Sequence, residues 1–297
     1  MTRILLLAVF ALALATPAVA QNDLQEHCPA GNSFCVRMGE AAELTQVRTG
    51  IGLAGGNPIM GASSTLGMRL GAIPRVTIAG RMTGVQLNVP NTIDANATGD
   101  IGNFPRSLNV DAAVGVFSGL SLLPTVGGFG SIDLVASYGS MGLPDEFLQE
   151  SIQSWAVGVR IGILRESFTA PGLSITGMYR SIDDAQLGST FGPADGPGTF
   201  FRLTDTKLWS ARATVGKRIF MLGATAGIGW DRFKGSAEAQ DALNFNVTAD
   251  DFSNSRTTIF GNLSWTMLIL NIVGEGGVQK GGPDDTLYGS LAIRLAL

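Results

Sequence analysis

Large hydrophobic residues in this chain alternate with small or charged ones over segments of about ten residues or more. From Trp155 to Ile163, every second position is large and apolar, and glycine, alanine or arginine stands between them. The pattern recurs after Pro74, after Leu208 and from Leu287 onward. Because successive side chains of a β-strand point to opposite faces, the alternation predicts strands with one apolar face. Their length is what a tilted strand needs to cross a membrane.

The connections between these segments alternate between short and long. Short turns are expected near residues 73–74, 124–128, 170–171, 219–220 and 267–268. Long polar connections are expected at 90–106, 140–153, 183–205 and 235–255, with a brief one at 281–285. Bacterial outer-membrane barrels have tight turns on one rim and extended loops on the other, so this asymmetry favours a barrel over a soluble sandwich.

The predicted fold class is all-β: a closed antiparallel transmembrane β-barrel of about twelve strands. Ten strands remain if the two glycine-rich segments at its start, 47–55 and 63–72, are not strands. The expected strands are 47–55, 63–72, 75–89, 107–122, 129–140, 153–168, 172–182, 206–219, 221–235, 255–266, 269–280 and 286–297.

Composition agrees with a barrel and excludes other classes. The chain of 297 residues is 45% hydrophobic but only 15% charged, and it contains 40 glycines. Few charges argue against intrinsic disorder, and a net charge of -4 argues against nucleic acid as a partner. The longest apolar run after residue 20, residues 263–274, is interrupted by polar residues and is shorter than the roughly 20 residues of a helical span.

Residues 1–20 have the pattern of a cleaved signal peptide. Arg3 precedes an apolar run from Ile4 to Ala15, and Ala18-Val19-Ala20 provides small residues for cleavage. The expected location is therefore the outer membrane of a Gram-negative bacterium, with outer-membrane lipid around the barrel.

Residues 21–47 are expected to form an N-terminal segment, either a periplasmic element or a plug, ahead of a barrel at 48–297. Its two cysteines, Cys28 and Cys35, are the only ones in the chain and predict a structural disulfide in an exported protein. Residues 36–47 could form a short helix.

Charged residues on the small-residue face of the predicted strands are candidates for the barrel interior, because an arginine facing lipid at mid-membrane costs about 2–4 kcal/mol. They line a water-filled path, or they pair with one another and with the N-terminal segment to close it. The candidate lumen-lining residues are Arg75, Arg81, Asp111, Asp133, Arg160, Arg212, Arg218, Asp231, Glu275 and Arg294.

The aromatic residues fall into two groups. One group lies near predicted strand ends, where amphipathic rings favour the membrane interface: Trp155, Tyr179, Trp209, Trp230 and Trp265. The other group is expected in long loops, as an exposed patch or, in the favoured interpretation, packed loop against loop: Phe191, Phe200, Phe201, Phe245 and Phe252.

Enzymatic and cofactor sites find little support. The sequence Gly50 to Gly55 matches a dinucleotide fingerprint, but Asn57-Pro58 follows where a helix is required. The only histidine, His27, lies outside the predicted barrel, which leaves a serine hydrolase without its usual base. Acidic pairs such as Asp183-Asp184 suit solvated loops. We expect no catalytic residue, no cofactor and no metal.

The mature chain resembles bacterial outer-membrane β-barrel proteins. In that class the last strand carries the signal for the barrel assembly machinery and usually ends on an aromatic residue, whereas this chain ends at Leu297. Gly55-Gly56-Asn57-Pro58, after a glycine-rich start, is similar to the long-chain fatty-acid transporter family, in which an N-terminal plug precedes the barrel.

Two functions follow as hypotheses. The first is a passive, porin-like channel or transporter for small solutes, hydrophobic ones among them. The alternative is a structural or adhesive barrel with a closed lumen, whose long extracellular loops bind a partner.

Overall fold

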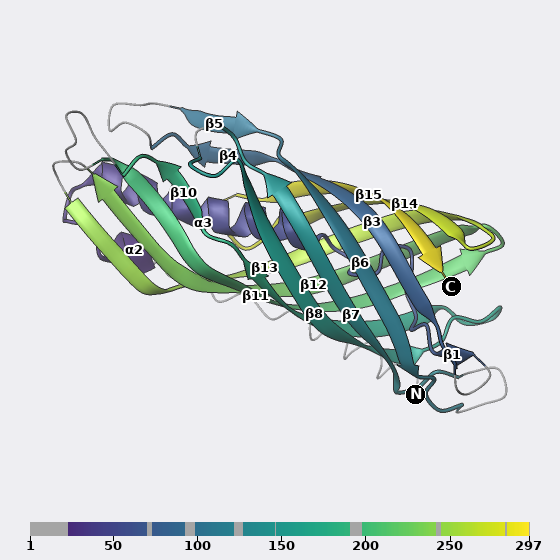
Figure 1. Ribbon diagram of the computed structural model, residues 1–297. Helices are drawn as coiled ribbons and strands as arrows, with labels where there is room; N and C mark the ends of the chain where they lie inside the picture. The colour runs from purple at the N-terminus through teal and green to yellow at the C-terminus, as the bar shows by residue number, and fades with distance from the viewer. Residues whose placement is uncertain are drawn as a thin grey trace.

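The computed structural model describes residues 23–69, 73–92, 99–121, 127–145, 147–190, 198–241, 245–282 and 284–296. The predicted signal peptide lies outside these residues, as do Phe191 and Leu297. Within the described residues, ten long antiparallel strands form a closed barrel around a helix (Figure 1). The strands are β3 (Val76–Val85), β6 (Arg106–Phe117), β7 (Ser131–Gly142), β8 (Ser151–Leu164), β9 (Gly172–Ile182), β11 (Phe200–Ile219), β12 (Leu222–Asp241), β13 (Phe245–Met267), β14 (Leu270–Lys280) and β15 (Thr286–Ala296).

Each barrel strand pairs with its neighbours in chain order, and the barrel closes where β15 pairs with β3. Leu291 of β15 lies opposite Met82 of β3, and the register continues from Tyr288 to Ala296. Closure matters because an open edge in lipid would leave backbone N–H and C=O groups without partners. The predicted all-β barrel is confirmed, with ten strands rather than about twelve.

Short pieces complete the fold. The strand β10 (Ala185–Gly188) pairs with β11 beyond the barrel. Two small pairs join β1 (Met68–Arg69) to β2 (Ile73–Pro74) and β4 (Leu87–Pro90) to β5 (Asp100–Asn103). The helices are α2 (Asp23–Glu26) and α3 (Ser33–Ala54).

The first two predicted strands are wrong. Residues 47–55 belong to α3 and the turn after it, and the described part of 63–72 is irregular except for β1. The glycines that weakened these segments as strands serve the helix instead. A Cβ at Gly50 would lie 2.1 Å from the Phe233 ring, and one at Gly52 would lie 3.0 Å from Met141 Sδ. Glycine therefore lets α3 lie against the barrel wall.

The outer face of the barrel is aliphatic, whereas the inner face is mostly polar or small, with some large apolar residues such as Phe260 and Tyr288. On β15, for example, Leu287, Leu291 and Ile293 are 57–60% exposed, whereas Ser290 and Ala292 between them are buried. This alternation suits a wall with lipid outside. No helix in the described part of the chain has the length and apolar character needed to cross a membrane.

Three aromatic rings form a row on the outer face near the end where the long connections lie. Tyr179 of β9 contacts Trp155 of β8 with 5.6 Å between ring centroids and Trp209 of β11 with 4.8 Å. Trp155 and Trp209 are about half exposed. Outward-facing rings in such a row are typical of the boundary between lipid and water.

We call the end of the barrel with the long connections the upper end and the end with the short turns the lower end. At the upper end β11, β12 and β13 continue well beyond the other strands. They exceed their predicted lengths of 206–219, 221–235 and 255–266. Their extensions pack on α2 and the first half of α3, and three of the phenylalanines expected in loops, Phe201, Phe245 and Phe252, lie within this core. Phe200, Phe201, Phe245 and Phe252 are at most 9% exposed. The favoured interpretation, packing rather than an exposed patch, is therefore the one observed, but the rings belong to strands and not to loops.

Candidate functional site

The helix α3 occupies the lumen of the barrel. It contacts β3, β6, β7, β11, β12, β13 and β15, so wall surrounds it on several sides. Figure 1 shows it in purple, running from the end where α2 lies into the interior. Its buried residues include the polar residues Thr45, Gln46, Arg48 and Thr49.

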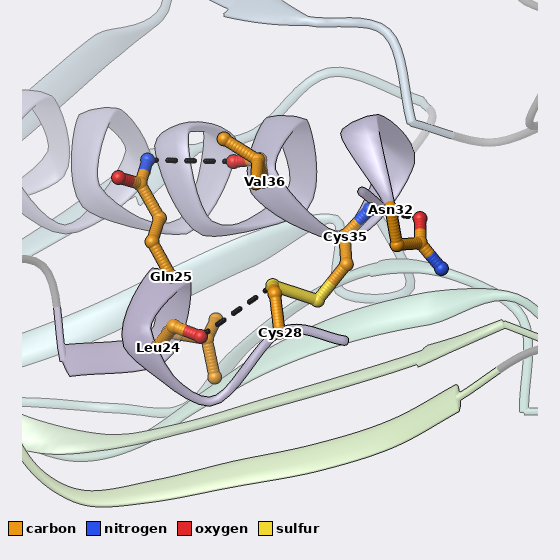
Figure 2. Close-up of a disulfide and its surroundings, with 6 residues drawn as sticks. All are labelled: Leu24, Gln25, Cys28, Asn32, Cys35 and Val36. Atoms are coloured by element: carbon orange, nitrogen blue, oxygen red, sulfur yellow. Dashed lines mark hydrogen bonds between the residues drawn. A yellow bond between two sulfur atoms is a disulfide. The ribbon is translucent and has the colours of Figure 1, made fainter. Parts of the chain in front are cut away.

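The start of α3 is fixed by a cap and a disulfide, which Figure 2 shows. The Asn32 side chain accepts a hydrogen bond from the Cys35 backbone N–H at 3.0 Å, which satisfies one of the free donors of the first turn. Cys28 and Cys35 form the predicted disulfide, with 5.7 Å between their Cα atoms, and this joins the stretch after α2 to the first turn of α3. The disulfide prediction is confirmed. The helix extends beyond the expected range of 36–47 at both ends.

The helix ends at Gly55, and an irregular stretch continues down the lumen as far as Gly67. Gly55 has φ +65°, a left-handed conformation that suits glycine at the end of a helix. We call residues 33–67, helix and irregular stretch together, the lumen segment.

Inward-facing charges of the wall hold the middle of the lumen segment by its backbone. The Glu275 carboxylate accepts from the backbone N–H groups of Gly56 at 2.9 Å and Asn57 at 3.1 Å. The Arg212 Nε–H donates to the Gly56 carbonyl at 3.0 Å. Arg81 donates to the carbonyl of Ala54 at 2.6 Å.

Two of these arginines also pair with carboxylates on the wall. Arg81 lies 2.9 Å from Asp111, and Arg212 lies 2.8 Å from Asp231, and all four side chains are buried. In each pair the carboxylate balances the charge of the arginine, and the same arginine donates a hydrogen bond to the lumen segment.

The lower part of the lumen segment is held in the same way by a second group of charges. Arg294 donates to the Met60 carbonyl at 2.7 Å, and Arg160 donates to the Ala62 carbonyl at 2.6 Å. Asp133 accepts from the Leu66 backbone N–H at 2.9 Å.

Eight of the ten sequence-predicted interior residues are thus buried within the barrel, and all eight contact the lumen segment or each other. The remaining two, Arg75 and Arg218, are exposed at the end with the short turns. Arg75 still reaches inward, since its guanidinium donates to the Leu66 carbonyl at 3.2 Å.

Sequence reasoning missed two interior arginines. Arg180 of β9 is 4% exposed and donates to the hydroxyl of Ser154 at 2.7 Å. Arg256 of β13 pairs with Glu43 of α3. Alternation along residues 172–182 and 255–266 could have placed both arginines on the inner face. Nothing local could have identified Glu43 as a partner, because that contact requires the helix to be inside the barrel.

Little space remains beside α3. One cavity next to Thr45 and Gln46 and another next to Ala54 and Arg180 each measure about 10 Å³, at the lower limit for a single water molecule. At the short-turn end a larger cavity of about 340 Å³ opens below the lumen segment. No cluster of metal-ligating side chains is found among the residues that the structure describes.

Comparison with known proteins gives fold-level likeness alone. No protein-family model and no curated protein matches the chain. Solved structures similar to it include the translocator domain of the autotransporter NalP from Neisseria meningitidis, at 10% identity and TM-score 0.40, covering 76% of this chain and 88% of that one. An outer-membrane channel from Pseudomonas putida F1 has 8% identity and TM-score 0.37, covering 80% and 98%. The Pseudomonas putida toluene transporter TodX has 8% identity and TM-score 0.32, covering 82% and 96%.

Proposed function

We propose that this protein is an outer-membrane transporter for small solutes, closed at rest by the lumen segment and opened when that segment moves. The observation that carries the proposal is the polar character of the contact between segment and wall. Inward-facing charges of the wall bind backbone groups of residues 54–66, and a solvated backbone can exchange such bonds for bonds to water.

The helical half of the lumen segment supports movement as well. Thr45 Oγ1, Thr49 Oγ1 and Gln46 Nε2 are buried without a hydrogen-bond partner. Water would hydrate these three groups if α3 moved, so movement would not expose an apolar surface at this part of the helix.

Hydrophobic solutes are among the proposed substrates because an apolar collar surrounds the lower half of α3. It contains Ile51 and Leu53 of the helix together with wall residues Val85, Met141, Ile152, Ile182, Phe260 and Tyr288. Displacement of the helix would expose this collar to a passing solute.

The proposed orientation has the short turns in the periplasm and the extended β11, β12 and β13 outside the cell. It follows from the loop asymmetry typical of bacterial barrels. The same proposal includes a signal peptide at residues 1–20 and an outer-membrane lipid environment. It also includes assembly of the barrel by machinery that acts on β15.

A reversible cross-link between α3 and the wall tests the proposal. A Cβ at Gly52 would lie 3.2 Å from Val85 Cγ1, close enough for a disulfide in the double variant Gly52→Cys/Val85→Cys. The measurement is conductance in planar bilayers with potassium chloride, and swelling of liposomes in arabinose, before and after reduction. The wild type treated in the same way is the control, because reduction opens its Cys28–Cys35 disulfide too.

We expect the oxidised variant to be silent and the reduced variant to conduct and swell like the wild type. Equal flux through the oxidised and reduced variants would show that solutes do not pass where α3 lies. Absence of flux from the wild type and from the loosened variant Glu275→Ala would exclude transport.

A second candidate function, contact with a partner at the long-loop end, is supported by the apolar core between α2, α3 and the extended strands. A folded head of this kind presents a fixed surface. Deleting residues 183–205, the long connection identified in the sequence, would remove β10 and the buried Phe201. Shortening residues 189–198 instead leaves both in place. Loss of cell-surface attachment with an intact barrel would favour this candidate.

A further inference from the structure

The cavity of about 340 Å³ at the short-turn end brings three arginines together. Arg75, Arg218 and Arg294 line it, together with residues 61–66 of the lumen segment. Glu166 is the one acidic side chain among the described residues that line it, so the lining carries a net charge of +2.

Arg294 is the buried member of this group. It is 6% exposed, and its guanidinium donates to the carbonyls of Met60 and Gly61 at 2.7 and 3.4 Å. Its Nε is buried without a hydrogen-bond partner. Among the described residues no carboxylate lies within ion-pair distance of it, whereas Arg81 and Arg212 higher in the lumen each have one.

Arg160, the next charge up the lumen, does not relieve this imbalance. It bonds to the carbonyls of Ala62 and Ser64 and forms no ion pair with a described residue. Glu166, whose carboxylate accepts a hydrogen bond from the Arg218 backbone N–H, offsets only one of the three positive charges at the cavity. A buried cation without a counter-charge is costly, so the site favours an anion from outside the chain.

The type of anion follows from the donors and from the rim. Arginine donates in a planar fork that matches the oxygens of a phosphate, and several arginines on one group suit more than one negative charge. The rim includes Leu268 and Ile269 of the β13–β14 turn, which are 99% and 53% exposed, beside the charged floor. We propose that this cavity binds a phosphate group, carried by an anionic phospholipid or by a soluble phosphate ester.

The test uses the whole barrel, purified in nonionic detergent. Its probes are phosphatidylglycerol, phosphatidylcholine and glycerol 3-phosphate, with binding measured by native mass spectrometry for the lipids and by calorimetry for the ester. The variant is Arg75→Ala/Arg218→Ala, which removes exposed side chains. The matched control is Arg232→Ala/Lys234→Ala, which removes two exposed cations from the outer face of β12. Heat-modifiable migration on a gel checks that each variant is folded.

We expect the wild type and the control variant to bind a phosphate probe, and the Arg75→Ala/Arg218→Ala variant to bind it at least about tenfold more weakly. Preference for phosphatidylglycerol over phosphatidylcholine with no binding of glycerol 3-phosphate identifies a lipid. Saturable, arginine-dependent binding of glycerol 3-phosphate identifies a soluble ester. The proposal is overturned if neither anionic probe binds, if the two lipids bind equally and glycerol 3-phosphate does not bind, or if the variant binds as tightly as its control.

Discussion

The Glu275 carboxylate holds the backbone N–H of Asn57 with both of its oxygens, at 3.1 and 3.3 Å. The two residues are far apart in the sequence, and their contact fixes the lumen segment just below the end of α3. A charged side chain in a barrel interior is usually discussed as part of a pore lining. In this protein the Glu275 carboxylate anchors the segment that fills the barrel lumen.

Loss of this anchor should loosen the lumen segment without opening the wall. Glu275→Ala leaves the N–H groups of Gly56 and Asn57 without their acceptor, at a cost of about 1.5–3 kcal/mol for a hydrogen bond to a charged group. We expect faster proteolysis after residues 53–57 and higher bilayer conductance. Glu238→Ala, in a partly exposed ion pair, is the control. Unchanged protease sensitivity would contradict the anchoring role.

The buried and exposed ion pairs should differ sharply in their effect on stability. Asp231→Ala leaves Arg212 buried without a counter-charge, and we expect the free energy of unfolding to fall by about 3–5 kcal/mol. Glu238→Ala breaks the pair with Arg202, whose charged atoms are 3.8 Å apart and partly exposed, and should cost at most about 1 kcal/mol. Urea unfolding in detergent, followed by tryptophan fluorescence, compares the two. An equal loss of unfolding free energy in the two variants would mean that the ion pair of Arg212 with Asp231 is solvated.

Two leucines with similar exposure should respond differently to a charge. Leu291 on the wall is 60% exposed and Leu148 in a long connection is 64% exposed. If the wall faces lipid, Leu291→Arg should cost about 2–4 kcal/mol of barrel stability in liposomes, whereas Leu148→Arg should cost close to nothing. Urea unfolding in liposomes of short-chain lipid, followed by tryptophan fluorescence, measures the free energy of unfolding of both variants. A tolerated arginine at 291 would place that face in water.

Stability at the long-loop end should depend on pH through Glu40 of α3. Burial, and then the charges of Asp284, Glu43 and Asp100, raise the pKa of Glu40 above its usual value of 4.5. An acid with a raised pKa binds its proton more tightly in the folded chain, so its favourable contribution is present below pH 4.5 and is lost as the pH rises through the folded-state value. Glu40→Gln should therefore raise the thermal midpoint at pH 8 and leave it nearly unchanged at pH 4. The exposed Glu26→Gln is the control, and an equal gain at both pH values would refute this origin.

Alternation was enough to predict the ten barrel strands because each strand has one environment on each face. Trp155, Val157 and Val159 face outward and Arg160 faces inward, whatever lies beyond the wall. The same rule places Arg180 and Arg256 on the inner face. Strand ends were less accurate for β11 to β13, because their extensions pack on α2 and α3 and their outer face is no longer aliphatic there.

Residues 47–67 could not be placed in this way. Gly50 and Gly52 weaken a strand and a helix alike, so local preference leaves the choice open. The surrounding wall decides it, through the close approach of Phe233 and Met141 to the helix.

The sequence by itself therefore determined the barrel, its inner and outer faces and the disulfide, since these depend on period-two patterning and on the spacing of two cysteines. Only the tertiary structure decided that the lumen is filled and that its charges bind the segment filling it. The reason is physical: a hydrogen bond from the Glu275 carboxylate to the backbone of Asn57 uses an atom that every residue has. A contact with the backbone leaves no side-chain pattern in the sequence from which it could be predicted.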